Sequence, residues 1–102
     1  MTTSSKVWLI SGANTGFGLE LSQKALQEGD KVIAAVRNPS KIPDELKRPE
    51  VSTIAFDLSW SQDKINDFAK AANEAFGTID VVVNNAAYAY MGAIEESTLV
   101  IP

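Results

Sequence analysis

The sequence contains neither cysteine nor histidine. Without cysteine, neither a disulfide framework nor a thiolate metal site can form. Without histidine, the chain lacks the commonest general base and the commonest metal ligand. The apolar runs are far shorter than the roughly 20 residues of a membrane span, and no signal-peptide pattern opens the chain. We therefore expect a soluble, cytoplasmic protein that does not engage a membrane.

Size and charge narrow the class further. The chain has 102 residues, of which 45% are hydrophobic and 22% charged. This composition is typical of one small globular domain and too apolar for a disordered chain. The formal net charge of -4 argues against nucleic acid as a partner.

Apolar stretches alternate with helical patterns along the whole chain. The expected strands are residues 6–10, 32–36, 51–56 and 79–83. The expected helices are residues 17–28, a short one at 44–48, and one from a capping box at Ser59–Gln62 up to Gly77. The unbroken apolar run at 32–36 is typical of a parallel strand covered on both faces. This pattern predicts an α/β fold with a Rossmann-type doubly wound parallel sheet of about four strands, in the order 3-2-1-4.

Three of the six glycines stand within seven residues, directly after the first expected strand: Gly12, Gly16 and Gly18. Glycines at this place allow a tight turn and the close approach of a pyrophosphate, which the N-terminus of the next helix attracts. A P-loop is excluded, because Leu19 and Glu20 follow the last glycine instead of Lys and Ser or Thr. A glycine-rich turn that binds no ligand is the open alternative.

The spacing Ser11-Gly12-x-x-x-Gly16-x-Gly18 resembles the Thr-Gly-x-x-x-Gly-x-Gly motif of the short-chain dehydrogenase/reductase family, with Ser11 in the Thr position. Phe56-Asp57-Leu58 resembles the segment of that family with an adenine-binding Asp. The segment 84–87 resembles its Asn-Asn-Ala-Gly motif, with Ala87 in the Gly position. The resemblance covers roughly residues 6–96. It implies a nicotinamide dinucleotide as cofactor and hydride transfer with a small carbonyl or alcohol substrate.

The resemblance also implies roles for individual residues. The phosphate turn would consist of Gly12, Asn14, Thr15, Gly16, Phe17 and Gly18. The Asp57 carboxylate would accept a hydrogen bond from the adenine amino group, and the Leu58 N–H would donate to the ring. Asn84 and Ala86 would lie beneath the nicotinamide ribose. Two alternatives stay open, namely that Asp57 is a helix-entry carboxylate and that Asn84 only joins strand ends.

The end of the second expected strand indicates the choice of cofactor. NAD-binding proteins of this architecture carry an acidic residue there, which binds the ribose 2′-hydroxyl. This chain has Arg37 followed by Asn38. A guanidinium pairs with a 2′-phosphate, whereas a carboxylate would repel it. We therefore expect NADP, with NADPH preferred over NADH, and we interpret the basic residues at 41–48 as a solvated loop. Thr15 departs from NADP-dependent relatives that carry a second basic residue there.

The resemblance does not extend to catalysis. The chemistry of the family needs a Tyr-x-x-x-Lys pair and a Ser, and no such pair occurs in this chain. Tyr88 and Tyr90 are followed four residues later by Gly92 and Ile94, so we expect them to line the crevice or to pack a loop. The prediction is one NAD(P)-binding domain over residues 1–102, truncated before the catalytic segment. The alternatives are a non-catalytic nucleotide-binding or interaction protein, and a fragment without independent function.

The fourth expected strand raises a question of assembly. With only four strands, the outer edge of 79–83 would present unpaired backbone groups on an apolar surface. The apolar tail at 99–101 is short and would shield little of it. The sequence therefore predicts self-association, or binding of a partner chain, through this edge.

Overall fold

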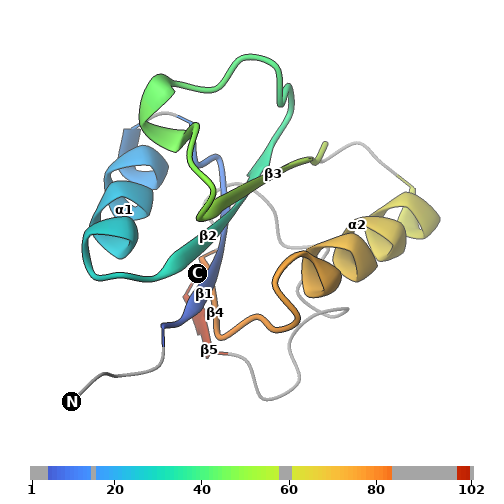
Figure 1. Ribbon diagram of the computed structural model, residues 1–102. Helices are drawn as coiled ribbons and strands as arrows, with labels where there is room; N and C mark the ends of the chain where they lie inside the picture. Colours follow the sequence, from blue (N-terminus) through green and yellow to red (C-terminus); the bar gives the residue numbers. More distant parts are fainter. Residues whose placement is uncertain (1–4, 15, 58–60, 84–98, 102) are drawn as a thin grey trace.

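The computed structural model describes residues 5–14, 16–57, 61–83 and 99–101 and contains a five-stranded parallel sheet (Figure 1). In chain order the elements are β1 (Val7–Ser11), α1 (Gly16–Gln27), β2 (Lys31–Val36), η1 (Asp44–Leu46), β3 (Val51–Ala55), α2 (Gln62–Ala75), β4 (Val81–Val83) and β5 (Leu99–Ile101). The strand order is β3-β2-β1-β4-β5, and every pairing is parallel. The predicted Rossmann-type α/β sheet with the order 3-2-1-4 is confirmed.

The sheet separates two apolar clusters, one under each helix. Figure 1 shows α1 and α2 on opposite sides of the strands. Successive strand residues point to opposite faces, so Leu9 packs in the cluster that contains α2 side chains, and Ile10 packs in the cluster that contains α1 side chains. In β2, Ile33 packs in the cluster with α2 side chains, and Val32 packs in the cluster with α1 side chains. This double burial explains why the strands read as unbroken apolar runs.

The helices differ from their predicted bounds in instructive ways. The expected short helix is a single 3₁₀ turn, η1. The predicted capping box beginning at Ser59 is wrong: α2 is capped by Ser61, whose Oγ accepts from the Lys64 N–H at 3.5 Å. The Gln62 side chain does not return to the cap but donates to Asn66 at 3.0 Å. Ser59 itself lies outside the described residues. Within the described ranges, neither helix is long and apolar enough to cross a membrane.

The outer edge of β4 is paired, which corrects the prediction of an open fourth-strand edge. β5 lies beside β4 in parallel, with Val81 opposite Leu99, Val82 opposite Val100 and Val83 opposite Ile101. The prediction failed because it considered only the apolar surface that the side chains of residues 99–101 can cover. Its backbone can nevertheless supply the ladder partners that an edge strand lacks.

Two carboxylates hold the amino end of β1 in the sheet. The Asp30 side chain accepts from the Lys6 N–H and from the Trp8 indole N–H, each at 2.9 Å. The Asp80 side chain accepts from the Val7 N–H at 2.8 Å. Both carboxylates belong to segments that precede a neighbouring strand, so they align β1 with β2 on one side and with β4 on the other. In this register the carboxyl ends of β1, β2 and β4 lie at the same edge of the sheet.

Candidate functional site

The glycine stretch forms a tight turn between β1 and α1. Gly12 and Gly16 have φ values of 64° and 56°, a left-handed conformation that residues with a Cβ rarely adopt. Gly18 is required for another reason. A Cβ at this position would lie 2.8 Å from the Gly12 carbonyl carbon and closer still to its oxygen. The Gly12 N–H donates to the Ala35 carbonyl at 2.9 Å, which fixes the turn against the end of β2.

A pocket of about 260 Å³ opens beside this turn, where β1, β2 and β3 end. Its apolar part is formed by Ala35, Val36 and Phe56. Its polar part is formed by Ser11, Gly12, Asn14, Arg37, Asn38 and Lys41. The volume is below the roughly 300–1,000 Å³ of typical small-molecule sites. The described residues therefore enclose only part of a typical small-molecule site.

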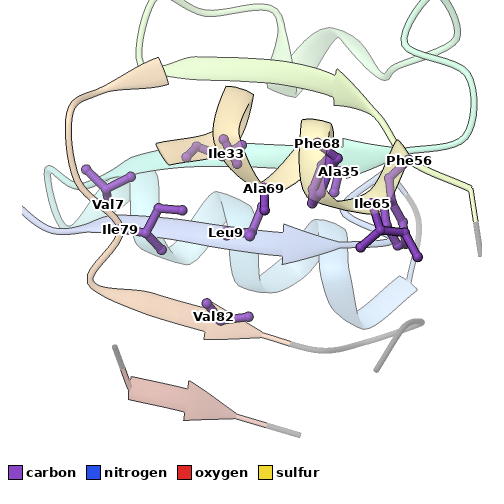
Figure 2. Packing of buried hydrophobic residues seen from close by; sticks show 11 residues of the cluster. Val7, Leu9, Ile33, Ala35, Phe56, Ile65, Phe68, Ala69, Ile79 and Val82 are labelled. Atoms are coloured by element: carbon purple, nitrogen blue, oxygen red, sulfur yellow. The ribbon is translucent and has the colours of Figure 1, made fainter. Parts of the chain in front are cut away.

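Backbone and side-chain contacts hold the strand ends around the pocket. The Phe56 N–H donates to the Val36 carbonyl at 2.8 Å, which joins the end of β3 to the end of β2. The buried Ser11 hydroxyl donates to the Val83 carbonyl at 3.4 Å, which joins β1 to β4. The Phe56 ring lies 4.7 Å from the ring of Phe68 in α2. Figure 2 shows these two aromatic residues with Ile65 at the carboxyl end of the sheet. Helix α2 thus supports the apolar wall of the pocket.

The charge of the pocket is positive although the chain as a whole is negative. Arg37 and Lys41 line it, and among the described lining residues there is no carboxylate. The other two basic residues of this region face acidic partners outside the pocket: Lys47 pairs with Asp44 at 3.1 Å, and Arg48 pairs with Glu50 at 3.2 Å. The solvated loop expected for 41–48 therefore describes Lys47 and Arg48, whereas Lys41 belongs to the pocket.

The structure brings together several residues that the sequence indicated. Five of the predicted site residues line the same pocket: Ser11, Gly12, Asn14, Arg37 and Asn38. Three further predicted residues, Gly16, Phe17 and Gly18, form the start of α1 and follow the pocket residue Asn14 closely in the sequence. Phe17 is 62% exposed. Asp57 follows Phe56 but does not line the pocket as described. Thr15, Leu58, Asn84 and Ala86 lie outside the described residues, as do Tyr88 and Tyr90.

Four pocket residues are not assigned from the sequence, namely Ala35 and Val36 of β2, Lys41 and Phe56. Phe56 was noted only as the neighbour of Asp57, and its position at the end of a strand was the available signal. Lys41 was placed in a solvated loop. The signal for Lys41 was the segment Asn38-Pro39-Ser40, because Asn-Pro favours a turn. A turn there returns the following residue towards the strand end.

The fold and this turn define a nucleotide-binding protein of the Rossmann type. Two features define that class: the doubly wound parallel sheet, and the glycine turn at the carboxyl end of β1. A family profile described as short chain dehydrogenase matches residues 6–100. The chain belongs to the short-chain dehydrogenase family.

Similar proteins agree with this membership. The chain is 36% identical over 94 residues to "Oxidoreductase BOA17" of Botryotinia fuckeliana. The matched segment covers 89% of this chain and 34% of that protein. It is 34% identical over 99 residues to "Uncharacterized oxidoreductase YxnA" of Bacillus subtilis, which covers 92% of this chain and 28% of that protein. The chain thus spans about a third of the length of these relatives.

Solved structures give the same result. A short-chain dehydrogenase from Streptomyces avermitilis superposes with a TM-score of 0.74 at 32% identity, over 83% of this chain and 32% of that one. A short-chain dehydrogenase/reductase from Burkholderia phymatum, solved in complex with NAD, superposes with a TM-score of 0.69 at 30% identity, over 80% of this chain and 31% of that one. A 3-ketoacyl-(acyl-carrier-protein) reductase from Brucella melitensis, complexed with NADH, has a TM-score of 0.66 at 30% identity, over 79% of this chain and 34% of that one.

Proposed function

We propose that residues 1–102 act as the dinucleotide-binding domain of an NADP(H)-dependent oxidoreductase, which transfers hydride between the nicotinamide and a carbonyl or alcohol substrate. The observation that carries this proposal is the pocket beside the glycine turn. It holds Arg37, which directly follows β2, and Lys41 from the loop after β2, and within its described lining there is no carboxylate. Family membership supports the reaction class, and the pocket supports the cofactor. The cytoplasmic location stays a prediction from the sequence.

The turn supports binding of a pyrophosphate. Helix N-termini attract anions through their free N–H groups and the helix dipole. The first turn of α1 carries no acidic side chain that would compete for these groups. The left-handed Gly16 has open space where a Cβ would stand, which leaves backbone that a phosphate can approach closely, and Gly18 lets the start of α1 pack against the Gly12 backbone.

The preference for NADP rests on Arg37. Two solved relatives are complexed with NAD or NADH, so membership of the family does not by itself select the cofactor. A carboxylate that would bind the 2′-hydroxyl is absent from the described pocket lining, and a guanidinium stands at the end of β2. Such a group suits a phosphate monoester, because its planar donors can make paired charge-assisted hydrogen bonds.

The remaining cofactor contacts are part of the same proposal. In the adenine region we assign the Asp57 carboxylate and the Leu58 N–H. In the phosphate turn we assign Asn14, Thr15 and Phe17, and beneath the nicotinamide ribose we assign Asn84 and Ala86. A binding protein without catalytic activity, or a fragment that needs further chain to function, would keep these contacts, because the chain lacks the Tyr-x-x-x-Lys pair.

Replacing Arg37 tests the proposed cofactor. Arg37→Gln removes one guanidinium from the pocket, and we expect it to weaken NADPH binding by about 1.5–3 kcal/mol, or roughly 10–150-fold, with little change for NADH. Titration of both cofactors by fluorescence measures this difference. Arg48→Gln is the matched control, because Arg48 pairs with Glu50 and does not line the pocket. Equal affinities of the unchanged protein for NADPH and NADH would refute the NADP assignment.

A further inference from the structure

The loop after β2 is folded into a closed turn by one side chain. The Asn38 Oδ1 accepts hydrogen bonds from the Ser40 backbone N–H at 3.1 Å and from the Ser40 hydroxyl at 2.6 Å. The Lys41 N–H donates to the Asn38 carbonyl at 3.0 Å. The chain therefore reverses between Asn38 and Lys41, and the turn closes with the hydrogen bonds of an Asx turn. Lys41 returns to the same pocket that Arg37 lines.

The side-chain oxygen of Asn38 is engaged within the turn. An amide oxygen accepts through two lone pairs, and the two bonds from Ser40 use both. The sequence assigned Asn38 to the cofactor site, and its bonds point instead to a role in shaping the loop.

The two cations of the pocket have no ion pair among the residues that the structure describes. Lys47 and Arg48 are paired with carboxylates, whereas neither Arg37 nor Lys41 forms an ion pair within the described residues. A phosphate monoester carries up to two negative charges at neutral pH. Two cations in the lining of one pocket match that charge better than one. Arg supplies directed donors, and Lys supplies a compact point charge.

We propose that Lys41 is a second specificity residue for the ribose phosphate, and that Asn38 positions Lys41 through the turn instead of contacting the ligand. This inference rests on the proposed binding of NADP(H). It assigns Lys41 a binding role that the sequence did not indicate, and it changes the role of Asn38. The ligand group is a phosphate monoester on the adenosine ribose, which NADPH has and NADH lacks.

Four variants test the proposal: Lys41→Gln, Asn38→Ala, the double variant, and Lys47→Gln as the matched control. Each is titrated with NADPH and with NADH, after circular dichroism has verified its fold. Lys41→Gln should weaken NADPH binding about tenfold and leave NADH binding within about twofold, since one charge-assisted contact is lost. Asn38→Ala should weaken NADPH binding less, about threefold, because Lys41 is present but no longer held. Lys47→Gln should change neither.

The double variant separates positioning from contact. If Asn38 acts through Lys41, the double variant should bind NADPH no more weakly than Lys41→Gln alone, within about twofold. Full additivity of the two losses would mean that Asn38 contacts the ligand, and would overturn its positioning role. Asn38→Ser can close the turn only weakly and should give an affinity between those of Asn38→Ala and the unchanged chain.

The outcomes distinguish this inference from the proposed function. If Arg37→Gln weakens NADPH binding and Lys41→Gln does not, the role of Lys41 is wrong while the NADP assignment holds. If Lys41→Gln weakens NADPH and NADH equally, Lys41 contacts a group common to both, and the proposed specificity role is wrong. If the unchanged protein binds neither cofactor, the proposed function itself fails.

Discussion

At the scale of the residue, the glycine turn depends on two different properties of glycine. Gly16 is needed for its backbone conformation, since its φ is 56° and no other atom lies within 4 Å of the place where a Cβ would stand. Gly18 has no such φ but is buried against the backbone of Gly12. The two positions look alike in the motif and should respond differently to the same substitution.

Substitution by alanine separates these two properties. Gly16→Ala should lower the free energy of unfolding by about 1–2 kcal/mol, the usual cost of a left-handed residue with a Cβ. Gly18→Ala should lower it by about 3 kcal/mol or more, because the backbone of Gly12 would have to move. Urea unfolding followed by tryptophan fluorescence gives both values. Equal losses would contradict the close packing of Gly18 against Gly12.

At the scale of the element, the pairing of β5 with β4 decides whether the sheet has an open apolar edge. All three residues of β4 are buried, and β4 lies between β1 and β5. Each parallel partner contributes hydrogen bonds along the ladder. β5 joins from a segment that begins 16 positions after Val83, so its contribution depends on closing a loop of that length.

Proline in β5 tests this pairing. Val100→Pro removes a backbone N–H and fixes φ in the middle of the strand, so the β4–β5 ladder should weaken. Amides at 81–83 should then exchange faster with solvent, and light scattering after size-exclusion chromatography should detect self-association at micromolar concentration. Val100→Thr keeps the N–H and the β-branch and is the control.

The unchanged protein provides the reference for this test. Slow amide exchange at 81–83, with no association, agrees with a covered edge. Rapid exchange at the positions that face β5 in the unchanged protein would contradict the pairing.

At the scale of the whole molecule, the chain has a pocket beside the glycine turn and lacks the catalytic pair of its family. No Tyr is followed four residues later by Lys, and the last lysine is Lys70. The proposed binding needs the sheet, the turn and the pocket, whereas general acid catalysis needs a positioned proton donor beside the substrate. Binding and turnover should therefore be separable in this chain.

An activity assay tests that separation. We expect the purified chain to oxidise NADPH with a panel of aldehydes and ketones at a rate reduced by at least the roughly 10²–10⁴-fold that general acid–base catalysis contributes. A short-chain dehydrogenase with an intact Tyr-x-x-x-Lys pair, assayed in parallel, is the control. Robust turnover by the 102-residue chain would mean that another group supplies the proton.

The sequence by itself determined the order of elements and the glycine turn. Strands buried on both faces must be apolar at every position, so β2 could be recognised without any knowledge of its neighbours. Left-handed conformations and close backbone approach favour glycine, so Gly12, Gly16 and Gly18 marked the turn in advance. The apolar strand positions and the glycines of the turn can be recognised because each residue type is set by its own burial or backbone conformation.

Only the tertiary structure decided which loop residues face the pocket and how the sheet edge is closed. Lys41 and Lys47 are both basic residues in one loop, yet one lines the pocket and the other pairs with Asp44. Lys41 directly follows the turn at Asn38, whereas Lys47 follows η1. The partner of β4 is likewise a segment distant in sequence. Such choices depend on which segments meet in space, and contacts of that kind leave no local periodicity in the chain.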